Sequence, residues 1–141
     1  MDKSSSNMYS PDQKRVTATE VNGSVENIVQ AFIAWLEAKG IIIYATVNHA
    51  KDMRDRGIEP AVEAWTVIFG NPALGAGMLA IDPEIVVDIP LRVGFYGRDE
   101  GTTVVVRRLM HGSMSDYDQT DLMAPANTAD TLVNSWIDSL S

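Results

Sequence analysis

The sequence contains no cysteine among its 141 residues. This absence excludes disulfide bonds, thiolate metal ligands and a cysteine nucleophile. The sequence also lacks a long uninterrupted apolar run, so we expect no membrane-spanning helix and no membrane partner. The first residues, Met1 to Pro11, are polar and serine-rich without an apolar core. A secretory signal needs such a core, so we expect a cytoplasmic protein.

Positive charge is scarce, because 11 Lys and Arg residues stand against 19 Asp and Glu residues and give a formal net charge of -8. A surface of this sign repels phosphate backbones, so we expect no nucleic-acid partner. The hydrophobic fraction of 45% and the charged fraction of 21% are ordinary for a globular protein. We therefore expect a flexible polar tail over residues 1–12 and a single domain over residues 13–141.

The clearest predicted element is a helix over residues 24–39. Ser24 is a favourable N-cap residue, apolar side chains recur at helical spacing after it, and Gly40 follows as a typical helix stop. Residues 41–47 form a nearly continuous, β-branched apolar run, which predicts a buried strand. A second apolar stripe at helical spacing predicts the last helix over residues 128–140.

The remaining segments are less regular. Strands are predicted over residues 14–21, 65–69, 91–96 and 102–109, and the last two form a hairpin. We expect a short exposed helix over 50–56, a loose helix or a loop over 72–80, a helical turn over 83–87 and a long polar loop over 110–125. Hairpins mixed with helices favour an α+β fold, with a mainly antiparallel sheet of about five strands and helices on one face, over a doubly wound fold.

Several short motifs occur in a fixed order along the chain. They are Glu37-Ala38-Lys39-Gly40, Asn48-His49-Ala50, Phe69-Gly70-Asn71-Pro72 and Asp88-Ile89-Pro90-Leu91. In this order they resemble the family catalogued as domain of unknown function 302, over residues 17–109 and again in the last helix. Two positions depart from the family pattern, since Asn48 stands where Asp is frequent and Ile89 where Leu is usual.

The resemblance implies a fold similar to the TATA-binding-protein class. Such a fold has a curved antiparallel sheet with helices on one face and is often paired as a homodimer. The resemblance implies no established reaction, and we expect no cofactor.

His49 and the junction at Gly70-Asn71 are candidate functional positions. His49 follows a predicted strand and can act as a base near neutral pH, but no acid or serine stands at a recognisable spacing from it. Its alternative role is to hold a loop by hydrogen bonds. Gly70 and Asn71 suit a tight turn, or they present amide groups to a ligand.

Asp88 and Arg92 form a second candidate pair. They lie on the same side of an extended segment, because their positions differ by an even number. They either make a solvated ion pair on the surface or, together with Tyr96, line a polar pocket.

The aspartate-rich segment 116–121 looks superficially like a calcium loop. A calcium hand needs an oxygen ligand at its fifth position, a glycine at its sixth and a glutamate at its twelfth. Those positions hold Thr120, Asp121 and Asn127, so a site of this kind is excluded. His111 lies upstream but is too isolated to indicate zinc, and we predict no metal site.

These residues support three hypotheses. The first is a non-catalytic binding module, a homodimer with a small-molecule pocket between the concave sheet face and the loops at Asn48-His49 and Asn71-Pro72. The second is a hydrolase or isomerase in which His49 is the general base and amide groups at Asn71 stabilise an anion, which requires the two to lie close together. The third is a purely structural or protein-partner domain, which an exposed apolar sheet patch without a pocket would favour. The candidate ligand-binding set comprises Asn48, His49, Gly70, Asn71, Asp88, Arg92 and Tyr96.

Overall fold

The computed structural model describes residues 16–140, so the predicted tail over 1–12 and the start of the first predicted strand lie outside the described residues. The described chain forms a five-stranded antiparallel sheet in the order β1-β5-β4-β3-β2. Its strands are β1 (Val16–Asn22), β2 (Ile42–Asn48), β3 (Ala64–Gly70), β4 (Leu91–Gly97) and β5 (Thr102–Arg108). The α-helices are α1 (Val25–Ala38), α2 (His49–Arg54), α3 (Pro72–Ile81) and α4 (Met123–Asp138). Short 3-10 helices occupy η1 (Pro83–Val87), η2 (Met110–Asp116) and η3 (Thr120–Leu122).

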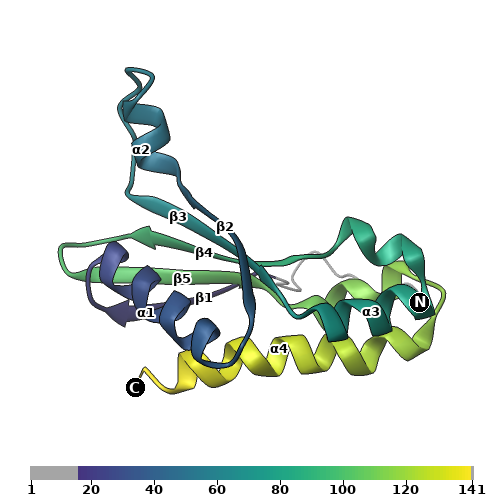
Figure 1. Ribbon diagram of the computed structural model, residues 1–141. Helices are drawn as coiled ribbons and strands as arrows, with labels where there is room; N and C mark the ends of the chain where they lie inside the picture. Colours follow the sequence, from purple (N-terminus) through teal and green to yellow (C-terminus); the bar gives the residue numbers. More distant parts are fainter. Residues whose placement is uncertain (1–15, 141) are drawn as a thin grey trace, which may run out of the picture.

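The two long helices, α1 and α4, lie on the same side of the sheet (Figure 1). Between them the ring of Phe32 on α1 and the indole of Trp136 on α4 have centroids 4.6 Å apart, and Phe69 and Phe95 close the core from the strands. Burial of these aromatic side chains is the main force that holds the helices against the sheet. The predicted α+β fold with helices on one face is confirmed.

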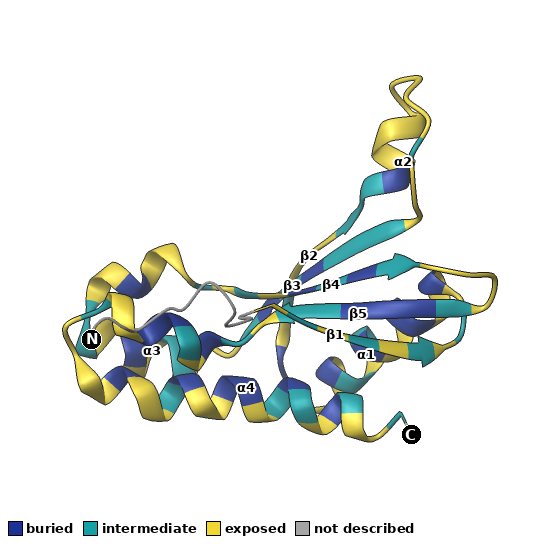
Figure 2. Ribbon diagram, turned by 180° about the vertical axis from the view of Figure 1, so that it is seen from behind, coloured by how far each residue is buried: buried dark blue, intermediate teal, exposed yellow. Residues whose placement is uncertain are grey.

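The opposite side of the sheet, which we call the open face, has a different character. Alternate strand residues project to opposite sides, and on this side Val16, Ile42 and Tyr44 are exposed. Neither α1 nor α4 covers this face (Figure 2). Exposed apolar side chains on an uncovered sheet face leave surface that a ligand or another protein can bury.

The first predicted helix and its termini follow the sequence closely. The Ser24 hydroxyl accepts the backbone N–H of Asn27 at 3.3 Å at the start of α1. Gly40 ends the helix in the left-handed region with a φ of 74°. The following strand, β2, pairs with β3 through an irregularity between Ile43 and Ala45, which places Tyr44 at a bulge.

The β2–β3 hairpin extends away from the body and carries α2 at its tip (Figures 1 and 2). We call residues 48–64 the arm. Within α2 only Ala50 is buried, and the guanidinium of Arg54 pairs with Glu63 across the base of the arm. The short exposed helix that the sequence predicts at this position is confirmed.

A second, smaller apolar cluster lies beyond the ends of β3, β4 and β5. It joins α3, η1, η2 and η3 to the first half of α4, and its buried members are Met78, Ile85, Met110, Met114, Leu122, Ala126 and Ala129. The helix α4 therefore spans two clusters (Figure 2), with Trp136 in the first and Ala126 in the second.

This second cluster corrects two sequence-based expectations. The predicted long polar loop over 110–125 is wrong, because the segment forms η2, η3 and the first turn of α4, and it buries Met110, Met114 and Leu122. The ambiguous segment 72–80 is a regular helix that the side chain of Asn71 caps. No helix in the described part of the chain has the length and apolar character needed to cross a bilayer.

Candidate functional site

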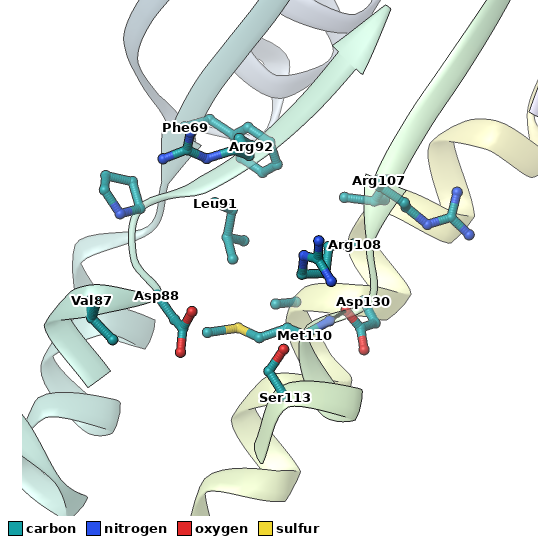
Figure 3. Close-up of a pocket in the computed structure, with 13 residues that line it drawn as sticks. Phe69, Val87, Asp88, Leu91, Arg92, Arg107, Arg108, Met110, Ser113 and Asp130 are labelled. Atoms are coloured by element: carbon teal, nitrogen blue, oxygen red, sulfur yellow. Dashed lines mark hydrogen bonds between the residues drawn. The ribbon is translucent and has the colours of Figure 1, made fainter. Parts of the chain in front are cut away.

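The strands β4 and β5 pair only from Gly94↔Val106 to Gly97↔Thr103. Beyond these pairs the two strands diverge, and a cavity of about 250 Å³ lies between their ends, η2 and α4 (Figure 3). We call it the arginine cavity. Its walls are formed by Phe69, Val87, Asp88, Pro90, Leu91, Arg92, Arg107, Arg108, Met110, Ser113, Ala129, Asp130 and Val133.

Arg92 and Arg108 flank this cavity from the two diverging strands (Figure 3). Both side chains belong to the open face by strand alternation, and both residues are exposed. Neither guanidinium makes an ion pair or a hydrogen bond with another residue of the described part. The mouth of the cavity therefore carries two positive charges without internal partners.

Both carboxylates of the cavity wall are already engaged. Asp88 accepts the hydroxyl of Tyr117, and burial together with this hydrogen bond raises the pKa of Tyr117. Asp130, which is buried, accepts the backbone N–H of Met110 at 2.7 Å and that of His111 at 3.0 Å. Its Oδ2 atom also accepts a hydrogen bond from Nδ1 of His111. These contacts leave both carboxylates of the wall engaged with groups other than Arg92 and Arg108.

Arg107 lies in the wall, but its guanidinium points toward α4 rather than into the gap (Figure 3). There its Nη2 donates to Oδ1 of Asn134. Its Nε and Nη1 atoms are buried and have no hydrogen-bond partner in the described part of the structure. Burial lowers the pKa of Arg107, while the carboxylates of Asp130 and Asp138 act in the opposite direction.

A second cavity, the apolar groove, adjoins the first. It has a volume of about 480 Å³ and lies between α3, η1 and the bulge of β2. The residues that line it are Tyr44, Gly70, Asn71, Pro72, Leu74, Gly75, Ala76, Met78, Leu79, Val86, Ile89, Pro90 and Leu91. Pro90 and Leu91 line both cavities, so the segment before β4 is the wall between them.

The candidate residues predicted around Gly70 and Asp88 are distributed over both cavities. Gly70 and Asn71 border the apolar groove, where the Asn71 side chain accepts the backbone N–H of Ala73 at 2.9 Å and caps α3. Asp88 and Arg92 both line the arginine cavity, but no ion pair joins them within the described part.

Tyr96 lies elsewhere. It is near the far end of β4, opposite Ala64, where its hydroxyl accepts a hydrogen bond from Arg98 at 3.4 Å. It does not line the arginine cavity, so the polar pocket expected from Asp88, Arg92 and Tyr96 together does not form.

Asn48 and His49 lie in the arm. The Asn48 side chain accepts the backbone N–H of Lys51 at 3.1 Å and caps α2, and Nε2 of His49 lies 2.8 Å from the Thr66 hydroxyl. Asn48 pairs with Trp65, whereas Gly70 pairs with Ile42 at the opposite end of the hairpin. His49 and Asn71 are thus separated by the length of the β2–β3 ladder. The single pocket expected between their loops is not formed, and the two residues cannot share a catalytic centre.

Sequence reasoning missed Arg108 and Asp130, although both carried a recognisable pattern. Arg107-Arg108 ends a strand of β-branched residues in a protein short of positive charge. Asp130 stands on the buried side of α4, where a carboxylate requires fixed hydrogen-bond partners. No cluster of three or more His, Cys, Asp or Glu side chains suited to a metal exists within residues 16–140.

Comparison with known proteins gives a consistent picture of the fold. Residues 17–140 match the family described as "Domain of unknown function DUF302". A crystal structure of an uncharacterized conserved DUF302 protein from Bacillus stearothermophilus superposes with a TM-score of 0.81 at 12% sequence identity, covering 92% of this chain and 100% of that one. At this identity the likeness extends to the fold alone. No curated protein matches the sequence significantly.

Proposed function

The chain belongs to the DUF302 family, and we propose that this member is a non-catalytic module that binds a small organic monoanion, a carboxylate, in the arginine cavity. One observation carries the proposal. Arg92 and Arg108 flank a cavity and have no acidic partner in the described part of a protein whose formal net charge is -8.

Charge balance favours an anion between these two side chains. Arg92 and Arg108 are like charges on adjacent strands, so each raises the electrostatic energy of the other. An anion that lies between them offsets this repulsion and accepts hydrogen bonds from both guanidinium groups. Such charge-assisted bonds are about twice as strong as neutral ones, and the planar fork of arginine matches the two oxygens of a carboxylate.

The surrounding groups favour a single negative charge and a small head group. The carboxylates of Asp88 and Asp130 lie in the same cavity wall and repel a dianion more than a monoanion. The volume of about 250 Å³ is below the range of about 300–1,000 Å³ that is typical for drug-sized ligands. A carboxylate with a short organic body meets both conditions.

The arrangement supports binding rather than catalysis. His49, the residue proposed as a general base in the enzymatic alternative, lies in the arm and not at the cavity. Ser113 lines the cavity, but the imidazole of His111 is bound to Asp130 and is not part of the wall. A nucleophile and a base directed at one reacting atom are the minimum for nucleophilic chemistry, and these residues do not provide them.

The test compares butyrate with its neutral amide, butyramide, by ligand-detected NMR titration. We expect butyrate to bind and butyramide to bind at least about tenfold more weakly, because the amide lacks the charge that each guanidinium recognises. Arg92→Gln and Arg108→Gln should each weaken butyrate binding about tenfold. Arg56→Gln is the control, since Arg56 lies in the arm, away from the cavity wall, and its guanidinium donates to the backbone carbonyl of Asp52. Equal binding of acid and amide, or equal loss in all three variants, would disprove the proposal.

A second candidate function is self-association, and the open face supports it. Val16, Ile42 and Tyr44 expose apolar surface there, and β2 is an edge strand with one unpaired side. We propose that a second copy of the chain covers this face. Sedimentation equilibrium should show a dimer that Ile42→Lys dissociates. Met123→Lys, at an exposed position on α4, is the control and should leave it intact. A monomeric wild-type protein would refute this candidate.

A further inference from the structure

We propose that the apolar groove holds the hydrocarbon chain of the same ligand, so that the protein binds a linear aliphatic carboxylate. The carboxylate lies between Arg92 and Arg108, and the chain crosses Pro90 into the groove. This inference rests on the proposed function, because it takes the arginine cavity as the site of the head group.

The first argument is continuity between the two cavities. Pro90 and Leu91 line both of them, so the two cavities meet at this segment. Arg92 of the arginine cavity and Gly70 of the apolar groove both belong to the open face. Arg92 pairs with Ile68 across β3 and β4, and Gly70 stands two residues beyond Ile68 on the same side of the sheet.

The position of Tyr44 confirms where the groove begins. A methyl group at Gly70 would lie 3.0 Å from Cε2 of Tyr44 and 3.8 Å from Cβ of Pro90. The tyrosine ring, the glycine and the proline therefore meet on the open face, close to the strand that carries Arg92. Because Gly70 has no side chain, the ring of Tyr44 packs directly against its backbone and forms this end of the groove wall.

The second argument is the character of the groove. Its lining is mostly apolar, and Leu79 and Val86 remain exposed there. Gly75 and Ala76 on α3 are small, which leaves open space that a larger side chain would fill. Apolar surface of this kind is stabilised when methylene groups displace water from it.

The third argument concerns the polar groups. The amide side chain of Asn71 is used as the cap of α3, where it accepts the backbone N–H of Ala73. A peptide would bring backbone donors and acceptors into the groove, and these need hydrogen-bond partners. A hydrocarbon chain has no polar groups that need hydrogen-bond partners. Because Arg92 and Arg108 stand at one end of the two adjoining cavities, they select a ligand with a single acidic group at one end.

The experiment measures the dissociation constants of acetate, butyrate, hexanoate and octanoate by isothermal titration calorimetry. We expect affinity to rise with chain length by up to about fourfold for each methylene group that enters the groove. Gly75→Leu should abolish this increase from butyrate to octanoate, because the new side chain occupies the groove, while butyrate binding persists. Gly77→Leu is the matched control, since Gly77 lies on the same helix, does not line the groove and has no neighbour within 4 Å.

Each result has a defined meaning. Binding of butyrate without any gain toward octanoate would overturn this inference and leave the proposed function standing. A gain that Gly75→Leu and Gly77→Leu reduce equally would also overturn it, because the chain would then lie elsewhere. Failure of every carboxylate to bind would refute the proposed function itself. Should Gly75→Leu fail to fold, Leu79→Ser replaces it, since Leu79 is an exposed wall residue whose loss should reduce the gain per methylene.

Discussion

The carboxylate of Asp130 on α4 accepts the backbone N–H of Met110 on η2 at 2.7 Å. A second backbone donor, the N–H of His111, is bound by the same side chain at 3.0 Å. Asp130 therefore satisfies two main-chain groups where β5 ends and η2 begins. Because Met110 is buried, its N–H has no easy access to water if this partner is removed.

Asp130→Ala should lower the free energy of unfolding by about 2–4 kcal/mol, since two backbone donors lose their acceptor. Asp130→Asn retains one carbonyl oxygen that can still accept a backbone hydrogen bond, so it should lower the free energy of unfolding less than Asp130→Ala does. Chemical denaturation in urea gives both values. Asp118→Ala, at an exposed position, is the control. An equal cost for Asp130→Ala and Asp118→Ala would show that the carboxylate does not hold η2.

Arg107→Met should leave the protein as stable as the wild type to within about 1 kcal/mol, or make it more stable. The reason is that Nε and Nη1 of Arg107 are buried without hydrogen-bond partners in the described part, so the charges of Asp130 and Asp138 offset their desolvation only in part. Methionine has an unbranched side chain similar to the aliphatic part of arginine, and it lacks the positive charge of the guanidinium. Thermal unfolding monitored by circular dichroism measures the change in stability. A decrease of several kcal/mol in the free energy of unfolding of Arg107→Met would contradict this prediction.

The ionisation of Tyr117 should make stability depend on alkaline pH. Burial and the hydrogen bond to Asp88 raise the pKa of Tyr117 in the folded state above its ordinary value of 10.0. Folding therefore favours the neutral form of the Tyr117 hydroxyl. Its contribution is complete below the unfolded pKa and is lost as the pH rises above it toward the higher folded pKa. Tyr117→Phe should weaken this alkaline loss and remove one tyrosine that ionises above the ordinary pKa of 10.0 from an ultraviolet difference titration. A titration curve that the substitution leaves unchanged would contradict the prediction.

Two glycines should respond in opposite directions to alanine. Gly77 lies inside α3 with no atom within 4 Å of a new methyl group, so Gly77→Ala should stabilise the fold by about 0.5–1 kcal/mol. Gly23 has a φ of 131°, and a methyl group there would lie 2.8 Å from Cδ1 of Ile28. Gly23→Ala should therefore destabilise the fold by more than about 1 kcal/mol. Urea denaturation of both variants gives the change in the free energy of unfolding. A change in the same direction for Gly77→Ala and Gly23→Ala would contradict this prediction.

Local patterns in the sequence were sufficient for most of the fold. Ser24 and Gly40 marked the ends of α1 because capping depends on one or two residues and the backbone between them. The apolar residues of α4, including Trp136, repeat at helical spacing and identified its buried side. The segment 110–125 could not be predicted in this way. Its buried Met110 and Met114 are separated by polar residues, and only contact with α3 and α4 reveals that they belong to a core.

The candidate site was predictable only in part. Asp88, Arg92, Gly70 and Asn71 line one or other of the two adjoining cavities. Arg108 was not recognised, since its relation to Arg92 depends on the register of β4 and β5, and a sequence does not state where paired strands begin to diverge. His49 was grouped with Asn71 because both follow strands, yet antiparallel pairing places them at opposite ends of the hairpin.

The short β4–β5 pairing has a mechanical consequence. Seven residue pairs join β1 to β5 and six join β3 to β4, but only four join β4 to β5. The β4–β5 ladder is therefore the shortest of the sheet, with Arg92 on one of its two strands and Arg108 on the other. An anion bound to both guanidinium groups would add a link between the two strands beyond the end of their backbone pairing. Amide hydrogen exchange in β4 and β5 should slow when butyrate is added.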